Sequence, residues 1–333
     1  MGEIGVRAIK ITPGLIYSSA LAALATVLTQ TVNNYIAISP LILAIIIGMI
    51  FRNATGLPKI FRPGVEFSLK RILRIAIIML GLKISVAEIA HIGSKGLIVV
   101  IASVVLTLAF SIWLGKHTRI SEELATLIGT GVSMCGASAV IAVGGVINAR
   151  DRNIAFAIAT VTLFGTVAMF VYPVLAKIMG LSSVFYGVWA GASIHEVAQV
   201  VAAGYAVSNT SGDIATVVKL SRVALLAPIA IVLGILLARK DVGGFSFRSV
   251  PVPYFILGFV AMIFINSVRI IPDAVSRAMI QIDDLLLAIA MAAMGLNTSF
   301  RDMKEVGIMP FYVGLIAWMF IASISYVLIS ILY

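Results

Sequence analysis

The sequence predicts an all-α polytopic membrane protein, and its composition, its long apolar runs and its Gly-rich interruptions are the observations that predict it. Of the 333 residues, 61% are hydrophobic and only 11% are charged. Soluble domains carry about 25% charged residues, so this chain lacks the polar surface that faces water. Apolar stretches of membrane-spanning length recur from end to end. We therefore expect a single integral membrane domain over residues 1–333, without a separate soluble domain or a cleaved signal peptide.

About eleven transmembrane helices can be placed on the apolar runs. They are 15–32, 36–52, 65–83, 96–115, 122–148, 153–179, 183–207, 213–238, 252–269, 283–299 and 307–333. Two of them, 122–148 and 183–207, are dense in Gly, Ala and Ser, which is typical of helices that pack closely or unwind. We expect these two segments to be broken helices in the core, and whether both cross the membrane or re-enter is left open.

The basic residues are unevenly distributed between the two sides of this map. The side that holds the N-terminus receives Arg7, Lys10, Arg52, Lys59, Arg62, Lys116, Arg119, Lys177, Arg239, Lys240, Arg248, Arg301 and Lys304. The opposite side receives only Lys83, Lys95, Arg150, Arg152, Arg269 and Arg277. Because cytoplasmic loops are enriched in Lys and Arg, this predicts a cytoplasmic N-terminus and a C-terminus outside the cell. It also explains the net charge of +10 without a nucleic-acid partner.

An internal repeat is visible between segments 36–93 and 252–307. Gly81-Leu82-Lys83-Ile84-Ser85 recurs as Gly295-Leu296-Asn297-Thr298-Ser299, and Met49-Ile50-Phe51 with Asn53 recurs as Met262-Ile263-Phe264 with Asn266. An odd number of predicted spans separates the copies, so the second copy would be upside down in the membrane. Inverted repeats are typical of secondary transporters. The alternative is a chance likeness between apolar helices.

Five polar side chains stand out in the otherwise apolar stretch 182–222, namely His195, Glu196, Gln199, Lys219 and Arg222. Charges at membrane depth are costly and usually mark a pathway or a binding site. Lys219 and Arg222 share one helical face, and their point charge and planar fork suit an oxyanion. The alternative is that the two cations only reach the membrane interface and that His195 only caps a carbonyl.

The first Gly-rich segment offers a candidate anion site. A half-helix that begins near Gly136-Ala137-Ser138 would present free N–H groups and the positive end of its dipole. Close packing through small residues is the alternative. Glu196 is the only carboxylate deep inside a predicted span, and it has two candidate roles: pairing with Lys219 or Arg222, or carrying a coupling proton. Gln199 shares its face.

Enzyme motifs are missing from the sequence, so we expect no catalytic residues, no metal and no cofactor. Ser133 lies in G-V-S-M-C-G, which is not a G-x-S-x-G elbow. His195-Glu196 lacks the second His of H-E-x-x-H. Cys135 is the only cysteine, which excludes an intrachain disulfide. The pair Asp283-Asp284 is predicted to begin a helix and to cap it.

Three motifs carry a resemblance to a known family. S-M-C-G-A-S-A-V-I-A at 133–142, W-A-G-A-S-I-H-E-V-A-Q-V at 189–200 and V-K-L-S-R at 218–222 resemble the sulfate exporter (YeiH-like) family of bacterial inner-membrane proteins, which is distantly similar to the cation/proton antiporter and bile-acid symporter group. The resemblance implies a panel-and-core architecture with alternating access. The antiporters use intramembrane aspartates, which the Gly-rich segments here lack. The residues carried over as substrate-binding candidates, with Ser193 added, are Ser133, Cys135, Gly136, Ser138, Ser193, His195, Glu196, Gln199, Lys219 and Arg222.

We therefore predict a secondary transporter that exports a small anion of the sulfate or sulfonate class across the bacterial plasma membrane. The alternatives are a cation/proton antiporter that uses Glu196, and a membrane protein with a structural or regulatory role and no substrate. The expected partners are the small anion and the lipid bilayer, with a homodimer as a candidate assembly and no nucleic acid.

Overall fold

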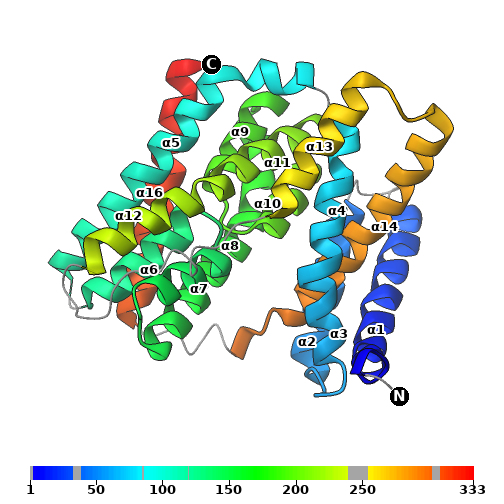
Figure 1. Cartoon of the computed structure of the whole chain (residues 1–333), viewed down its shortest axis with the longest axis horizontal. Coiled ribbons are helices and arrows are strands. Elements are labelled where there is room, and N and C mark those ends of the chain that lie inside the picture. Colours follow the sequence, from blue (N-terminus) through cyan, green and yellow to red (C-terminus); the bar gives the residue numbers. More distant parts are fainter. Residues whose placement is uncertain (1–2, 33–38, 85, 119, 239–253, 302–307) are drawn as a thin grey trace. The chain divides into compact units, whose positions relative to one another are not determined.

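The computed structural model describes residues 3–32, 39–84, 86–118, 120–238, 254–301 and 308–333 (Figure 1). Every regular element in these residues is a helix. Six helices are long and apolar enough to cross a membrane: Lys10–Thr31, Gly93–His117, Asp151–Ile178, Asn209–Leu233, Ala274–Asn297 and Ile308–Leu332. Shorter apolar helices cover Pro40–Thr55, Ala137–Val146 and Tyr254–Val268. The all-α polytopic class is therefore confirmed, whereas the number of eleven transmembrane helices stays a prediction.

The chain divides into two compact units. The first unit comprises Met1–Ala90 and Tyr254–Arg301, and the second comprises His91–Pro253 and Asp302–Tyr333. Both units contain membrane-length helices. The predicted single integral membrane domain, without a soluble domain, stays a prediction.

The first unit is built from two helix pairs. Its elements are α1 (Glu3–Val32), α2 (Pro40–Thr55), α3 (Arg62–Phe67), the π-helical turn η1 (Ser68–Ile72), α4 (Leu73–Leu80), the 3₁₀ turn η2 (Gly81–Lys83), α13 (Tyr254–Val268) and α14 (Asp273–Asn297). Helix α2 packs on α14, and α13 packs on α4 and η2. A Cβ atom on Gly48 would lie 3.0 Å from the Cα atom of Gly295, so these glycines let the two backbones touch.

The two pairs in the first unit are held by equivalent hydrogen bonds. Asn53 Nδ2 donates to the carbonyl of Thr298 at 3.1 Å, and Asn266 Nδ2 donates to the carbonyl of Ile84 at 3.0 Å. The repeat matches Asn53 with Asn266 and Ile84 with Thr298, so exchanging the two copies reproduces the same bond. Helices α4 and α14, which belong to different copies, run in opposite directions (Figure 1). These features support an inverted relation between the copies.

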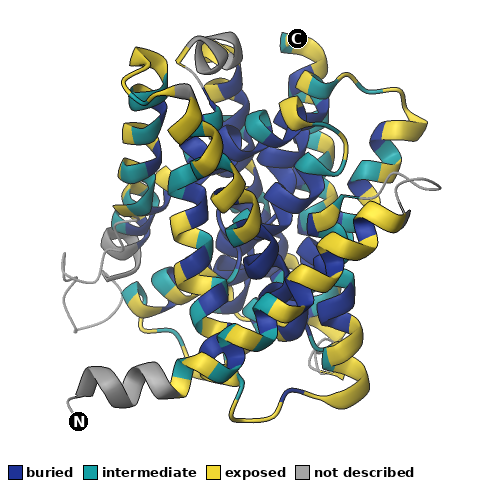
Figure 2. Cartoon of the chain, turned by 90° about the vertical axis from the view of Figure 1, so that its right-hand side faces the viewer, coloured by how far each residue is buried: buried dark blue, intermediate teal, exposed yellow. Residues whose placement is uncertain are grey.

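The second unit contains two pairs of short helices and longer helices that pack around them. Its elements are α5 (Val86–His117, shared with the end of the first unit), α6 (Glu122–Ser133), α7 (Ala137–Val146), α8 (Asp151–Ile178), α9 (Ser183–Ser193), α10 (Val197–Tyr205), α11 (Asn209–Ala224), α12 (Leu226–Ala238) and α16 (Ile308–Leu332). Helix α8 packs against α6, α7 and α10, and α11 packs against α9 and α10. In Figure 2 individual helices of the chain carry buried residues on one face and exposed residues on another. Many of those exposed residues are large and apolar, as is expected where lipid is the solvent.

Both Gly-rich segments are broken helices. Residues 134–136 separate α6 from α7, and residues 194–196 separate α9 from α10. At the first break Gly136 has φ +64°, a left-handed conformation that residues with a Cβ atom rarely adopt. At the second break Ile194 and Glu196 have extended backbone (ψ 145° and 151°), which ends one helix before the next begins.

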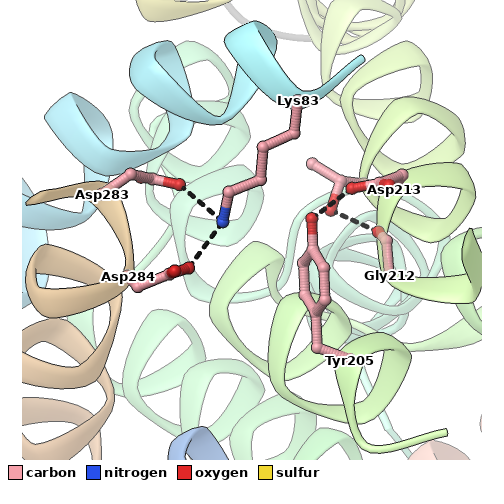
Figure 3. A network of polar contacts seen from close by, with 7 residues as sticks. Lys83, Tyr205, Gly212, Asp213, Asp283 and Asp284 are labelled. Atoms are coloured by element: carbon pink, nitrogen blue, oxygen red, sulfur yellow. Dashed lines mark hydrogen bonds and ion pairs between the residues drawn. The ribbon is translucent and has the colours of Figure 1, made fainter. Parts of the chain in front are cut away.

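The prediction that Asp283 and Asp284 begin a helix was wrong. Helix α14 begins ten residues earlier, at Asp273 after Pro272, so both carboxylates lie inside the helix and cannot cap its N-terminus. They instead bind a cation from η2: the Lys83 Nζ atom lies 3.1 Å from Asp283 Oδ2 and 2.6 Å from Asp284 Oδ1 (Figure 3). We call these three residues the lysine–aspartate cluster. In the second unit, Tyr205 donates a hydrogen bond to Asp213 (Figure 3).

Candidate functional site

The two helix breaks meet inside the second unit. A Cβ atom built on Gly136, at the first break, would lie 2.5 Å from Cγ of Glu196, at the second. The C-terminal ends of α6 and α9 and the N-terminal ends of α7 and α10 therefore gather at one place. We call this place, residues 132–138 and 191–199, the crossover. A side chain at position 136 would separate the two breaks, so the close approach requires glycine there.

Lys219 binds the C-terminal ends of both broken helices. Its ammonium group donates to the carbonyls of Met134 at 2.5 Å and Ile194 at 2.8 Å, and also to that of His195. A lysine has three N–H donors, so these bonds use all of them. The last carbonyls of a helix lack intrahelical partners and carry the negative end of the dipole, which explains why a cation is bound there.

Arg222, one turn further along α11, does the same with its guanidinium group. Nε donates to the carbonyl of Ser133 at 2.9 Å, Nη1 donates to those of Gly191 and Ile194 at 2.9 Å, and Nη2 donates to that of Val132 at 2.8 Å. The planar fork suits several carbonyls that converge from two helices. Arg222 thus fastens the end of α6 to the end of α9.

Both cations are buried rather than placed at an interface. Lys219 and Arg222 are each 0% exposed. Among the residues that the structure describes, no carboxylate lies within ion-pair distance of either cation, so the pairing that was one of the two candidate roles of Glu196 is not found. Backbone carbonyls already occupy most of their N–H groups. Direct contact of the two side chains with an anion stays a prediction. Two cations therefore lie in the core of the second unit without a side-chain counter-ion among the described residues.

Glu196 lies at the N-terminal ends of the other two half-helices. It is the N-cap of α10, where it forms a capping box with Gln199, whose Oε1 atom accepts the backbone N–H of Glu196 at 3.0 Å. Its Oε1 atom accepts a hydrogen bond from the hydroxyl of Thr162 at 3.3 Å. The carboxylate also lies beside the N-terminal end of α7, because a Cβ atom built on Gly136, the N-cap residue of that helix, would lie 3.3 Å from Glu196 Oε1. One carboxylate therefore serves two positive helix ends.

Burial divides the predicted site residues into two groups. Ser138 is exposed and Glu196 is partly exposed. The others are buried: Ser133, Cys135, Gly136, Ser193, His195, Gln199, Lys219 and Arg222. The crossover is thus sealed around its cations and accessible at the N-terminal ends of α7 and α10.

The remaining buried side chains of the crossover differ in whether they have hydrogen-bond partners. Ser193 donates to the carbonyl of Trp189 at 2.5 Å, within its own helix, and Cys135 is a free buried thiol. His195 Nδ1 lies 2.9 Å from the carbonyl of Val161, which matches the carbonyl-capping alternative. The Nε2 atom of His195 is buried without a hydrogen-bond partner among the described residues.

Helix α8 contributes residues that sequence reasoning missed. Thr162 binds Glu196, and Thr166 accepts a hydrogen bond from Gln199 Nε2 at 3.4 Å. Gly165 leaves room for the Gln199 amide, which a Cβ atom at that position would hit. The run T-V-T-L-F-G-T in an apolar span was the available signal, because hydroxyls and a glycine lie within two turns.

Comparisons with known proteins identify relatives across most of the chain. The family described as conserved hypothetical protein 698 matches residues 13–314. Curated relatives include UPF0324 membrane proteins of Bacillus cereus (38% identical; 87% of this chain and 86% of the relative) and of Corynebacterium glutamicum (37%; 95% and 91%). A third, from Pseudomonas putida, is 36% identical over 82% of this chain and 79% of its own length.

No solved structure matches the chain. The family match and the relatives support membership of a bacterial membrane-protein family, and they do not extend to the more specific sulfate exporter label. The helical architecture described above fits the description of those relatives as membrane proteins. This chain belongs to the family of conserved hypothetical protein 698, whose curated relatives are the UPF0324 membrane proteins.

Proposed function

We propose that this chain is a secondary transporter that exports a small anion, of the sulfate or sulfonate class, by alternating access. The observation that carries the proposal is the crossover, where two half-helix N-termini are accessible beside two buried cations that have no carboxylate partner in the described part of the chain. The inverted relation within the first unit adds support, because inverted repeats and broken helices occur together in secondary transporters.

The charge balance of the crossover favours a negative ligand. The partial charges of the two N-terminal and two C-terminal helix ends, about half an elementary charge each, cancel one another. Lys219 and Arg222 then outweigh Glu196 by one positive charge when the carboxylate is ionised. Uncompensated charge inside a membrane protein is costly, so an anion that binds here is attracted by a site of low dielectric constant.

The accessible groups define how the anion would be held. The backbone N–H groups of Ala137, Ser138 and Val197, at the starts of α7 and α10, and the hydroxyl of Ser138 are donors on the open side of the crossover. Lys219 and Arg222 would act through their charge and by fixing the helix ends. The sequence alone suggested that the two side chains coordinate the anion directly, and the proposal replaces this direct coordination.

The cellular setting of this proposal follows from composition and relatives. The excess of basic residues on one side favours a cytoplasmic N-terminus and a C-terminus outside the bacterial plasma membrane. A homodimer is part of the proposal only as a candidate assembly. Accessibility of single cysteines placed at each terminus of a Cys135→Ala variant to a membrane-impermeant thiol reagent tests the orientation.

Flux of labelled sulfate into proteoliposomes tests the proposed function. We expect the wild-type protein to accelerate sulfate flux over empty vesicles. Ser138→Glu places a negative charge at the open end of α7 and should reduce the flux at least tenfold. Ser94→Glu, the same change at an exposed position of α5, should leave it unchanged. Wild-type vesicles that move neither sulfate nor a sulfonate faster than empty ones would contradict the proposal.

A cation/proton antiporter is the second candidate, because Glu196 is a partly exposed carboxylate at the crossover. This function predicts that a pH jump drives Na⁺ movement in the absence of any permeant anion. A membrane protein without a substrate predicts instead that reversing the charge of Lys219 harms folding while no solute flux is measurable in the wild type. The sulfate and Na⁺ assays on the same vesicles separate the three functions.

A further inference from the structure

We propose that Glu196 is an internal anion that occupies the binding position when no substrate is present, and that each transported anion replaces its carboxylate after the carboxylate takes up one proton. This inference rests on the proposed function and specifies how transport is coupled. Glu196 thus competes with the substrate for one position. In the resting state of the crossover the carboxylate occupies this position, and in the loaded state the anion occupies it.

The geometry supports this role because the Glu196 carboxylate stands where an anion would bind. It meets the N-terminal end of α10 through the capping box, and it lies beside Gly136, the N-cap residue of α7. Because Gly136 has no side chain, nothing separates the Glu196 side chain from the backbone of this residue. A negative group that touches two helix N-termini uses the donors that an inorganic oxyanion would use.

The proposal assigns proton exchange with water to Glu196, because this residue is partly exposed whereas the two cations are 0% exposed. The buried Nε2 atom of His195, the preceding residue, has no hydrogen-bond partner among the described residues.

A comparison of the groups around Glu196 favours Glu196 itself as the proton carrier. Helix α8 presents the neutral hydroxyl of Thr162, and α11 presents Lys219 and Arg222, whose donors are held by carbonyls. The two breaks contribute His195, held at the Val161 carbonyl, and the buried thiol of Cys135. Among these titratable groups, Glu196 combines a carboxylate with access to the surface.

The transport step involves proton transfer and no change in the anion itself. Hydronium from the loading side gives one proton to the Glu196 carboxylate and becomes water. The neutral acid is a weaker acceptor for the helix N–H groups, since hydrogen bonds to ionised acceptors are about twice as strong. The anion then takes over these N–H groups. On the other side the anion leaves, the acid returns its proton to water, and the carboxylate closes on the two N-termini.

This cycle moves the anion and the proton in the same direction. Sulfate with one proton carries one net negative charge, so an inside-negative membrane potential favours its exit, and a higher proton concentration outside opposes it. A monovalent sulfonate with one proton moves without net charge. The antiporter alternative differs, because there the proton and its partner cation move in opposite directions.

The experiment measures sulfate and internal pH together in proteoliposomes loaded with a pH-sensitive dye. In the wild type we expect an inward sulfate gradient to acidify the lumen, with one proton for each sulfate. Glu196→Gln should carry sulfate with at least a tenfold smaller proton movement and with a rate that no longer depends on pH. Glu66→Gln, the same substitution at a surface position of the first unit (62% side-chain exposure), should behave like the wild type.

Each outcome of this experiment decides between the two proposals. Wild-type sulfate flux without proton movement overturns the coupling role and leaves the transporter function standing, whereas no wild-type sulfate flux overturns the proposed function. Continued proton movement in Glu196→Gln overturns the role of that residue. If Glu196→Gln does not fold, the wild type alone tests the stoichiometry: in vesicles held at zero potential by a K⁺ ionophore, a sulfate gradient and an opposing pH gradient must balance at one proton per sulfate.

Discussion

The crossover of the second unit and the lysine–aspartate cluster of the first unit both contain cations, but the charges of these cations are compensated differently. Lys219 and Arg222 bind seven times to backbone carbonyls and to no carboxylate among the described residues. Lys83 lies between two carboxylates. Carbonyls satisfy the N–H donors without cancelling the charge, whereas carboxylates do both. The first arrangement keeps a positive potential available for a ligand, and the second uses it up.

Removing a cation from the crossover should cause the largest loss of stability, and it is the strongest test of the difference between the two regions. Lys219→Met deletes three hydrogen bonds from a charged group and leaves buried carbonyls of two helix ends without donors. Hydrogen bonds to charged groups contribute about 1.5–3 kcal/mol each, so we expect a loss of at least about 4 kcal/mol of folding free energy. The measurement is the thermal unfolding midpoint of the protein in detergent. Lys177→Met, near the exposed end of α8, is the control and should unfold like the wild type.

Lys219→Arg refines the same test. It keeps the charge and the donors but changes their geometry, so it should retain more stability than Lys219→Met. Equal melting points for Lys219→Met and the wild type would show that the carbonyls do not need the ammonium group, and the assignment of Lys219 to helix-end binding would be wrong.

The lysine–aspartate cluster should respond less strongly and in a way that can be rescued. Lys83→Met removes the cation that faces Asp283, which is 0% exposed, and we expect a loss of about 3 kcal/mol, at the low end for a broken buried pair. Adding Asp283→Leu removes the buried charge as well and should recover most of that loss. No such rescue exists for Lys219, because its partners are backbone carbonyls. A double variant no more stable than Lys83→Met would remove this distinction between the two regions.

The sequence allowed the membrane class and the helix breaks to be predicted, since apolar content and clusters of small residues are local properties. It did not reveal what Lys219 and Arg222 bind. Their partners are carbonyls from residues 24–90 positions away, and a carbonyl is present at every residue, so no residue type marks those that are left without partners at a helix end. The side-chain chemistry of Lys219 and Arg222 predicts an anion as their ligand, whereas in the structure they bind the carbonyls of helix ends.

The lysine–aspartate cluster was missed for a similar reason. Lys83 and Asp283 are 200 residues apart, and the apolar run after Asp284 predicts the start of a helix at the two aspartates. The true start carried its own signal, Pro272 followed by Asp273, a usual pattern at helix N-termini. Thr162 was missed because a threonine in an apolar helix normally bonds its own backbone, as Thr160 does here.

The close approach of the two breaks is tested by a pair of glycine substitutions with a moderate expected effect. Gly136→Ala places a methyl group 2.5 Å from Glu196 Cγ, at a backbone conformation with φ +64°. We expect a loss of about 1–3 kcal/mol of stability, the usual range for a strained left-handed residue, together with loss of sulfate flux. Thermal unfolding and flux are measured on the same preparation.

Gly145→Ala is the matched control, because it lies in the next helix turns of α7, has ordinary helical backbone and would place its methyl group in open space. Alanine there should leave flux unchanged and raise stability by about 0.5–1 kcal/mol, since glycine weakens helix interiors. Equal behaviour of the two variants would mean that the crossover tolerates a side chain at position 136, against the geometry described.

The smallest effect is expected at the edge of the lysine–aspartate cluster, where water replaces protein as the partner of the charge. Asp284 is 63% exposed although it lies next to buried Asp283 on α14. Exposed ion pairs contribute about 0–1 kcal/mol, so Asp284→Asn should lower stability by no more than about 1 kcal/mol. Thermal unfolding at low and at high salt measures it, and the small loss should shrink further as salt screens the pair. A loss as large as that of Lys83→Met would mean that Lys83 depends on Asp284 rather than on Asp283, and the buried carboxylate would no longer explain why this region, unlike the crossover, has its cation neutralised.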